Sequence, residues 1–293
     1  MKTPEATQTR VRSLPDLMIE PLVRAALLED LGRAGDLTTD ATVPAGARAV
    51  VVMAARDVGV VAGTDLARLA FRLLDPEIVV DIERPDGTRV TPGDVIGTIS
   101  GPARGILTAE RVALNFLGHL SGVATATAQI ADAIAHTSTR VCCTRKTTPG
   151  LRVVEKHAVL AGGGINHRFG LDDAVLIKDN HIAVAGGVRA AIDRARAGVG
   201  HLVKIEVEVD TLDQLREVLT DPVDAVLLDN MGPALLREAV ALVAGRMITE
   251  ASGRITAATA PALAESGVDL VSAGWITHSA AVLDIGLDHV SVG

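Results

Sequence analysis

The stretch "LVKIEVEVDTLDQLREVLTDPVDAVLLDN", residues 202–230, decides the fold class of this chain. Residues 202–209 and 224–229 are short apolar runs typical of buried strands, and the segment between them has the period of an amphipathic helix. A strand, a helix and a second strand in this order form a crossover unit, which sets the two strands parallel in one sheet. The stretch therefore predicts an α/β domain.

The same alternation continues on both sides of this unit. Further apolar runs occupy residues 139–143, 173–178, 246–250 and 268–273, with helical patterns between them. Repeated units with continuous apolar strands predict a parallel sheet, arranged either as a barrel or as a doubly wound sheet.

The N-terminal part of the chain has a different pattern. Residues 15–32 show helical periodicity, whereas 47–63 and 90–101 are rich in β-forming residues interrupted by glycine turns. We interpret this part as a separate α+β domain, and we expect a helix at 107–120 to connect it to the parallel units.

Composition indicates a globular protein with a sizeable core. The chain has 293 residues, 48% hydrophobic and 22% charged. Its polar N-terminus lacks the apolar run of a signal peptide, and the run at 49–55 is much shorter than the ~20 residues that cross a bilayer. We expect a cytoplasmic protein that makes no contact with a membrane.

The two cysteines, Cys142 and Cys143, are adjacent in a predicted strand, so their side chains point to opposite faces. They do not form the Cys-x-x-Cys spacing of zinc sites, and we expect buried thiols in a reducing compartment.

The charge distribution favours a small anionic ligand. The net charge is −8 and only four residues are aromatic, which argues against a nucleic-acid partner. Residues 140–181 nevertheless contain seven Lys or Arg against four Asp or Glu, an excess of three positive charges. An acidic protein with one basic segment predicts a pocket for a polyanionic small molecule.

Charged and small residues follow the predicted strands one after another. In a parallel array these strand ends meet at one rim, where barrel enzymes hold their active sites. The residues at these ends, in chain order, are Arg145 and Lys146, Lys178, Glu208, Asp229, Ser252 and Gly253, and Gly274.

Two of these positions have competing interpretations. Lys178 could be a lysine extending its amine to solvent, or the Schiff-base lysine of a barrel aldolase. Glu206 and Glu208 share one face of their strand, and Glu208 with Asp229 would suit magnesium held through a substrate phosphate. The alternative is a structural ion pair of these carboxylates with Lys204 or another barrel lysine.

The glycine-rich segment 161–170 ends in His167 and Arg168. Arg168 is the better ligand candidate, because guanidinium binds carboxylates in a bidentate manner. Ser252, Gly253 and Gly274 stand between a strand and a helix, where free N–H groups favour a phosphate, although an ordinary helix cap gives the same pattern.

Taken together, these motifs resemble the quinolinate phosphoribosyltransferase family, the carboxylating nicotinate-nucleotide pyrophosphorylases. The resemblance covers nearly the whole chain. It rests on "LLEDLGRAGDLTTD" (27–40), "LTAERVALNFLGHLSGVATAT" (107–127), "TRKTTPGLR" (144–152), "AGGGINHRFGLDDAVLIKDNH" (161–181), "KIEVEVD" (204–210), "LLDN" (227–230) and "THSAAVLDIGLD" (277–288).

The resemblance implies an N-terminal α/β open sandwich at 1–118 and an incomplete parallel α/β barrel at 119–293, whose last ~15 residues could pack back on the first domain. It implies transfer of phosphoribosyl from phosphoribosyl pyrophosphate (PRPP) to quinolinate, with magnesium, giving nicotinate mononucleotide, pyrophosphate and carbon dioxide in NAD synthesis. It also implies a homodimer with shared active sites, and leaves a higher oligomer open. There are three rival functions: the molybdenum-utilisation paralogue of the same fold, the Schiff-base aldolase, and a non-catalytic binding protein. The complete set of "TRK", "HR" and "LIKDNH" motifs counts against the paralogue.

Carried onto this sequence, the family's site residues divide into three groups. The catalytic group is Lys146, Glu208 and Asp229, with the last two also as magnesium ligands. The quinolinate group is Arg111 from the partner subunit, with Thr144, Arg145, Lys146, His167, Arg168 and Lys178. The phosphate group is Ser252, Gly253, Arg254, Ala273, Gly274 and His278.

Three positions depart from the family pattern. Cys143 stands where the family usually has Asp, Arg254 replaces a glycine, and Trp275 replaces a small apolar residue. The last two bear on the geometry of the phosphate site.

Overall fold

The computed structural model describes residues 11–290, and the ends of the predicted domains, 1–10 and 291–293, lie outside them. Contacts divide the chain into two compact units. The first runs to Thr125 and also takes Leu160–Gly162 and the chain from Ala280, and the second comprises Ala126–Val159 and Gly163–Ser279. The division thus falls within a helix, a few residues after the predicted boundary at 118/119. No described helix is both long and apolar enough to span a membrane.

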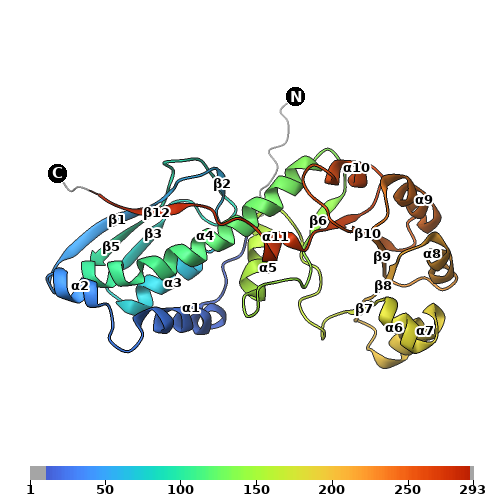
Figure 1. The fold of residues 1–293 in the computed structure, drawn as a ribbon, viewed down its shortest axis with the longest axis horizontal. Helices are drawn as coiled ribbons and strands as arrows, with labels where there is room; N and C mark the ends of the chain where they lie inside the picture. The colour runs from blue at the N-terminus through green and yellow to red at the C-terminus, as the bar shows by residue number, and fades with distance from the viewer. Residues whose placement is uncertain (1–10, 291–293) are drawn as a thin grey trace. The chain divides into compact units, whose positions relative to one another are not determined.

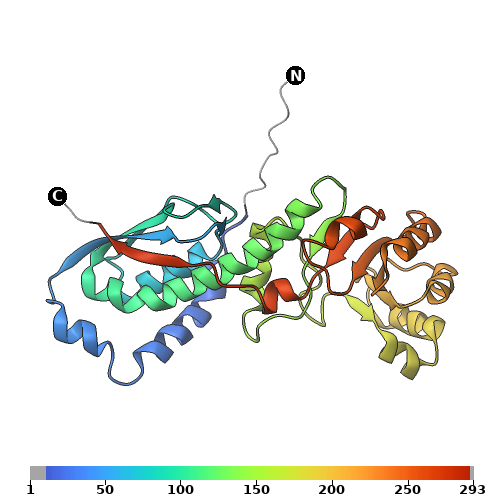
Figure 2. The ribbon, with the colours of Figure 1, turned by 45° about the horizontal axis from the view of Figure 1, so that its top comes forward.

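The first unit is built on an antiparallel sheet with strand order β12-β1-β5-β3. Helices α3 and α4 lie along one face of this sheet (Figures 1 and 2). A two-stranded pair, β2-β4, accompanies it. The elements are α1 (Asp16–Leu31), α2 (Leu37–Thr42), β1 (Arg48–Ala55), β2 (Gly59–Val60), α3 (Thr64–Leu74), β3 (Val79–Ile82), β4 (Arg89–Val90), β5 (Val95–Pro102), α4 (Ala103–Ala133) and β12 (Ile285–His289).

The last strand of the chain completes this sheet. β12 pairs antiparallel with β1, so that Met53 lies opposite Leu287, and Met53 is fully buried. A C-terminal segment that takes an edge of the first sheet ties the end of the chain to the N-terminal unit.

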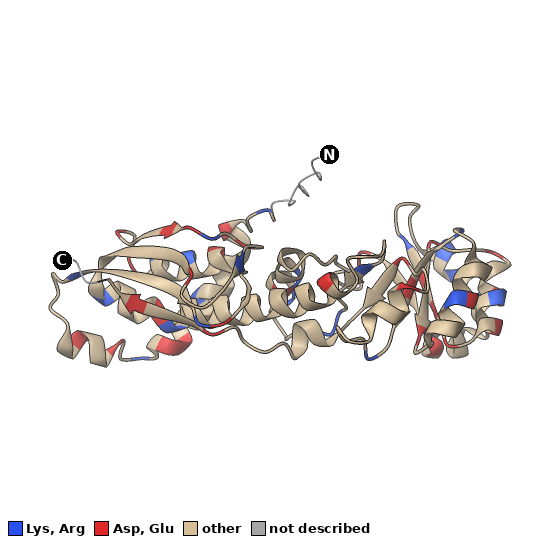
Figure 3. Ribbon diagram, turned by 90° about the horizontal axis from the view of Figure 1, so that it is seen from above, with Lys and Arg blue, Asp and Glu red and all other residues tan. Residues whose placement is uncertain are grey.

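The second unit contains a parallel sheet with strand order β6-β11-β10-β9-β8-β7. Helices α7, α8 and α9 cover its outer face, where basic and acidic positions are interspersed (Figures 1 and 3). The elements are β6 (Arg140–Cys142), α5 (Arg152–Ala161), β7 (Val175–Ile177), α6 (Asp179–Ala185), α7 (Val188–Gly198), β8 (Ile205–Val209), α8 (Leu212–Leu219), β9 (Ala225–Asp229), α9 (Pro233–Val243), β10 (Ile248–Ser252), α10 (Ala260–Ala264), β11 (Leu270–Ser272) and α11 (Trp275–His278).

The six strands match the six predicted runs, and the predicted class, an N-terminal α/β open sandwich followed by an incomplete parallel α/β barrel, is confirmed. Consecutive strands β6 and β7 take the two outer positions of the parallel sheet, and neither pairs with the other in the part of the chain described. The sheet therefore stays open, as an incomplete barrel requires.

Candidate active site

One face of the parallel sheet concentrates the polar groups. Residues paired across a parallel sheet point to the same side, and the register pairs Asp229 with Ser252 and Ser252 with Ser272. The same face carries Glu206, Glu208 and Glu250, which lie nearer the starts of their strands than Asp229 and Ser252 do. A core face of a sheet is normally apolar, so this row of acids and hydroxyls indicates a functional face.

Most predicted residues of the second unit lie at the carboxyl ends of these strands. The residues that follow or end a strand are Thr144, Arg145 and Lys146 after β6, Lys178 after β7, Glu208 near the end of β8, Asp229 at the end of β9, Ser252, Gly253 and Arg254 at β10, and Ala273 and Gly274 after β11. His278 is the last residue of α11, and His167 and Arg168 lie in the loop before β7. The structure thus brings the residues that follow or end a strand to one end of one sheet, whereas Arg168 binds the Ala174 carbonyl just before β7 begins.

The guanidinium groups of Arg145 and Arg168 each have an unpaired hydrogen-bond donor within the described part of the chain. The Nε of each is buried and has no hydrogen-bond partner among the described residues, although Arg168 Nη1 donates to the carbonyl of Ala174 at 3.0 Å. Burial lowers the pKa of Arg168, and the nearby charge of Arg145 lowers it further. Two close cations with unused N–H groups suit a ligand with more than one anionic acceptor.

Lys146 lies against the loop after β11. The hydroxyl of Thr277 donates to the Lys146 carbonyl at 2.7 Å, and the Lys146 N–H donates to Thr144 Oγ1 at 3.0 Å. A methyl group at Gly274 would come within 2.7 Å of Lys146 Cδ, so a larger residue there would have to displace the Lys146 side chain. The residues predicted to bind quinolinate and those predicted to bind phosphate are therefore in contact at this point.

Lys178 forms an ion pair with Glu208. A Schiff-base lysine needs an amine that is free to attack a carbonyl, whereas this amine is held by a carboxylate, which counts against the aldolase alternative. The alternative interpretation of the carboxylates is an ion pair with Lys204 or another barrel lysine. The pair of Glu208 with Lys178 agrees with it, whereas Lys204 binds Asp224 at 2.5 Å.

Glu208 and Asp229 fit the demands of a magnesium ion that is held mainly through a phosphate. They offer hard oxygen donors from neighbouring strands on the same face, and magnesium typically takes one or two carboxylates beside substrate phosphates. Asp229 Oδ2 accepts a bond from the side chain of the next residue, Asn230, at 2.6 Å, which orients it without neutralising it.

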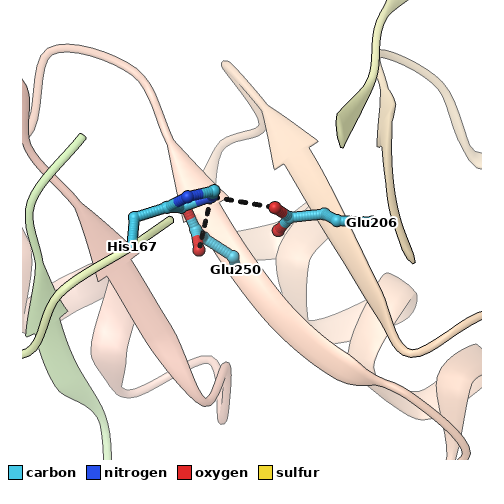
Figure 4. Close-up of side chains that lie close together, drawn as sticks. All are labelled: His167, Glu206 and Glu250. Carbon is cyan, nitrogen blue, oxygen red and sulfur yellow. Dashed lines mark hydrogen bonds and ion pairs between the residues drawn. The ribbon is translucent and has the colours of Figure 1, made fainter. Parts of the chain in front are cut away.

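His167 turns both ring nitrogens to protein groups. Nε2 lies 2.8 Å from Glu206 Oε2 and 3.9 Å from Glu250 Oε2, and Nδ1 accepts the Arg168 backbone N–H at 2.7 Å (Figure 4). Burial lowers the pKa of His167, but the bond to Glu206 and the charge of Glu250 together raise it. His167 therefore anchors the loop that carries Arg168.

Sequence reasoning missed two buried residues of this unit, Glu250 and Lys156. Lys156 is fully buried, and its ammonium donates to the His167 carbonyl at 2.8 Å and to Cys143 Sγ at 3.1 Å, with the ring of Phe169 4.9 Å away. Cys143 thus meets a lysine at the position where the family pattern has Asp. The adjacent charges in "VEKH" (154–157) gave no signal that both Glu155 and Lys156 are buried.

The predicted phosphate loops carry two of the departures from the family pattern. Arg254 follows Gly253 and adopts a positive φ of 36°. The Trp275 indole N–H donates to the Ile255 carbonyl at 2.6 Å, so this tryptophan links the segments that follow β10 and β11. His278 Nδ1 lies 2.6 Å from the Ser279 hydroxyl.

Arg111 belongs to the first unit. It lies on α4 with its side chain 65% exposed, and Glu110 is 3.9 Å from its Nη2. It borders a groove of about 300 Å³ lined also by Asp36, Leu107 and Thr108. An exposed arginine with one long contact remains available to a ligand or to a second chain.

Comparison with known proteins covers both units. Residues 36–121 match the family described as "Quinolinate phosphoribosyl transferase, N-terminal domain", and residues 123–288 match its C-terminal domain. The chain is 41% identical to the probable nicotinate-nucleotide pyrophosphorylase [carboxylating] of Bacillus subtilis, over 93% of each chain. It is 44% identical to the nicotinate-nucleotide pyrophosphorylase [carboxylating] of Mycobacterium leprae, over 91% of this chain and 95% of the relative.

Solved structures agree with these matches. NadC from Streptococcus pyogenes superposes with a TM-score of 0.91 at 41% identity, covering 96% of this chain and 100% of the other. The nicotinate-nucleotide pyrophosphorylase from Francisella tularensis gives a TM-score of 0.91 at 36% identity, covering 96% and 99%. The predicted family and enzyme class are confirmed: the chain belongs to the quinolinate phosphoribosyltransferase family.

Proposed function

We propose that the protein transfers the phosphoribosyl group of PRPP to quinolinate and releases pyrophosphate and carbon dioxide, leaving nicotinate mononucleotide for NAD synthesis. The observation that carries this proposal is the pair of buried guanidinium donors on Arg145 and Arg168 that have no partner among the described residues, with Lys146 next to Arg145 in the chain after β6. Quinolinate brings two carboxylates, and a pyridine with one carboxylate would leave part of this cationic set without a partner.

Positioning and electrostatics carry the transfer step. Bond formation at the anomeric carbon passes through an oxocarbenium-like state, so the enzyme needs no protein nucleophile. Glu208 and Asp229 present negative oxygens at neighbouring strand ends, suited to the ribose hydroxyls and the developing positive charge. Magnesium, when held by these two carboxylates and the substrate, would neutralise the departing pyrophosphate.

The phosphate of PRPP would occupy the loops after β10 and β11. Ser252, Gly253, Arg254, Ala273, Gly274 and His278 form this proposed set, and the bond from Trp275 to Ile255 holds the two loops together. Lys146 contacts Gly274 and would then lie between the ring acceptor and the phosphoribosyl donor.

Decarboxylation follows from the first step. Once the ring nitrogen is alkylated, it becomes an electron sink for loss of the adjacent carboxylate, and a proton takes the place of that group on carbon. Arg145 and Arg168 hold the dicarboxylate so that this bond can break in a largely desolvated pocket.

A homodimer with shared sites is part of the proposal. Arg111 is exposed, and its one ion pair within residues 11–290 is with Glu110 at 3.9 Å, which leaves it available to complete the site of a partner subunit. Homodimers of Arg111→Ala and of Lys146→Ala should each be nearly inactive. Random reassociation of the two should restore about a quarter of wild-type sites, because half the dimers are mixed and each has one intact site. Activity that stays at the parental level in mixed dimers verified by labelling would exclude action in trans.

The acceptor assay tests the reaction itself. With PRPP and magnesium, quinolinate should yield nicotinate mononucleotide, whereas nicotinate at the same concentration should yield little. Efficient turnover of nicotinate would contradict the proposed substrate. The cytoplasmic location expected from the sequence stays a prediction.

A further inference from the structure

Glu250 is a buried carboxyl group with no part in the steps above. It lies on β10, is 2% exposed, and points with Glu206 toward the ring of His167 (Figure 4). Its Oε2 lies 3.9 Å from His167 Nε2, and its Oε1 is buried without a hydrogen-bond partner. Two carboxylates thus face one imidazole.

The hydrogen bonds locate the proton of His167. Because the Arg168 backbone N–H donates to Nδ1, that nitrogen accepts and carries no proton. Nε2 therefore carries the proton and donates it to Glu206 at 2.8 Å. Because this proton is shared with Glu206, His167 offsets only part of the cost of a charge on Glu250: it lowers the pKa of Glu250, whereas burial and the charge of Glu206 raise that pKa more.

The rest of the surroundings gives Glu250 little compensation. Its register neighbours on β9 and β11, Leu227 and Leu270, are apolar, and the hydroxyl of Ser272 is close enough to ease its ionisation slightly. It lines a pocket of about 180 Å³. The titratable groups that face this pocket or the cluster are Glu206 from β8, Cys142 from β6, Lys156 from α5, and Arg168 and Lys204 at the pocket wall.

None of these groups is a free counter-ion for Glu250. Lys156 donates to Cys143 and to the His167 carbonyl, and Lys204 is paired with Asp224. Burial holds the pKa of the Cys142 thiol well above its usual range, so Cys142 stays neutral. A carboxylate in such a place is costly unless it takes up a proton.

We propose that Glu250 is a positioning residue that holds a proton while the dicarboxylate is bound, and that losing this proton weakens binding. The inference rests on the proposed function, since it concerns the same ligand. Ionisation of Glu250 adds one buried negative charge beside Glu206 and His167. Glu206, in the same cluster, already acts on the charge of Arg168, so an added charge there opposes an anionic ligand at Arg145 and Arg168.

The pKa of Glu250 places the change in binding affinity near neutral pH. Burial, followed by the charge of Glu206, raises the pKa of Glu250 to about 7. Glu250 is therefore protonated below this pH and ionises as the pH rises through it. By reciprocity, binding of the dicarboxylate raises this pKa further, and the protein takes up protons on binding.

Calorimetric titration with quinolinate tests this linkage. In the wild-type protein Kd should rise about fivefold to tenfold between about pH 6.5 and pH 8, because one linked proton gives at most tenfold per pH unit. Titrations near pH 7.5 in two buffers of different ionisation heat should show proton uptake. Quinolinate contributes none, since its carboxyl groups are ionised far below this range.

Glu250→Gln imitates the protonated state in nearly the same shape. It should lose most of the pH dependence and the proton uptake, and at about pH 8 it should bind quinolinate more tightly than the wild type. Glu265→Gln is the matched control, because Glu265 also pairs with an imidazole, His136 at 3.1 Å, but on the surface. It should retain the wild-type profile.

Two outcomes would overturn the inference. One is a Glu250→Gln protein with the wild-type pH profile and proton uptake. The other is equal weakening at every pH, which a merely structural role would give. If the wild-type protein failed to bind quinolinate at all, the proposed function would fail. Infrared spectroscopy would then show whether the buried carboxyl group of Glu250 carries a proton. The carbonyl band of a protonated carboxyl group, present at about pH 6 and lost in Glu250→Gln, supports it, and its absence refutes it.

Discussion

Replacing Arg168 by lysine tests how the dicarboxylate is held. Lysine keeps the positive charge but loses the planar fork and the Nε–H that has no protein partner. A hydrogen bond to a charged group contributes about 1.5–3 kcal/mol, so losing one such bond should raise the KM for quinolinate about tenfold to hundredfold. The fold should lose only about 1 kcal/mol, because Arg168 makes a single bond to the Ala174 carbonyl.

The assay is the initial rate of nicotinate mononucleotide formation against quinolinate at saturating PRPP and magnesium. Arg246→Lys is the matched control, since Arg246 also donates to main-chain carbonyls, those of Leu242 and Val243, but at the end of α9. Its KM should equal that of the wild type. If Arg168→Lys stayed within about twofold of this control, the role given to the guanidinium would be refuted.

Three other substitutions test the site and the fold. Lys146→Ala should lower kcat about 10²–10³-fold, as loss of a preorganised cation does, and near-normal turnover by a folded protein would place Lys146 outside the chemistry. Gly274→Ala should displace Lys146, whose Cδ would lie 2.7 Å from the new methyl group, and lower kcat with little change in thermal stability. Asp36→Ala removes the cap that accepts the Thr39 N–H at 2.9 Å and should cost about 1 kcal/mol in urea unfolding, whereas Asp36→Asn should cost less. The Thr39 bonds hold the pKa of Asp36 below its usual range, so this contribution should fade as the pH falls through that lowered pKa.

The parallel sheet could be predicted because its signal is local. Each strand is a short apolar run between turns, and its end is marked by a charged or small residue such as Asp229 or Gly274. The connecting helix was the weakest prediction of this kind. The expected helix at 107–120 is part of α4, Ala103–Ala133, because alanines and threonines beyond residue 120 continue it without an apolar–polar pattern that shows where it ends.

The buried network could not be predicted because it depends on register and burial. The alternation of β8 places Glu206 and Glu208 on one face, but it does not show that one pairs with His167 and the other with Lys178. Glu250 joins them only because β10 lies two strands away in the sheet. The orphan donors of Arg145 and Arg168 are likewise a property of the folded loops and have no local signal.

The most direct test of the central claim follows the carboxylate that leaves. Quinolinate carrying ¹³C in the carboxylate next to the ring nitrogen is mixed with PRPP, magnesium and the protein. Labelled carbon dioxide and pyrophosphate should appear in equal amounts, dependent on PRPP, and the mononucleotide should carry no label. Pyrophosphate release without labelled carbon dioxide, or a mononucleotide that retains the label, would contradict the proposed reaction.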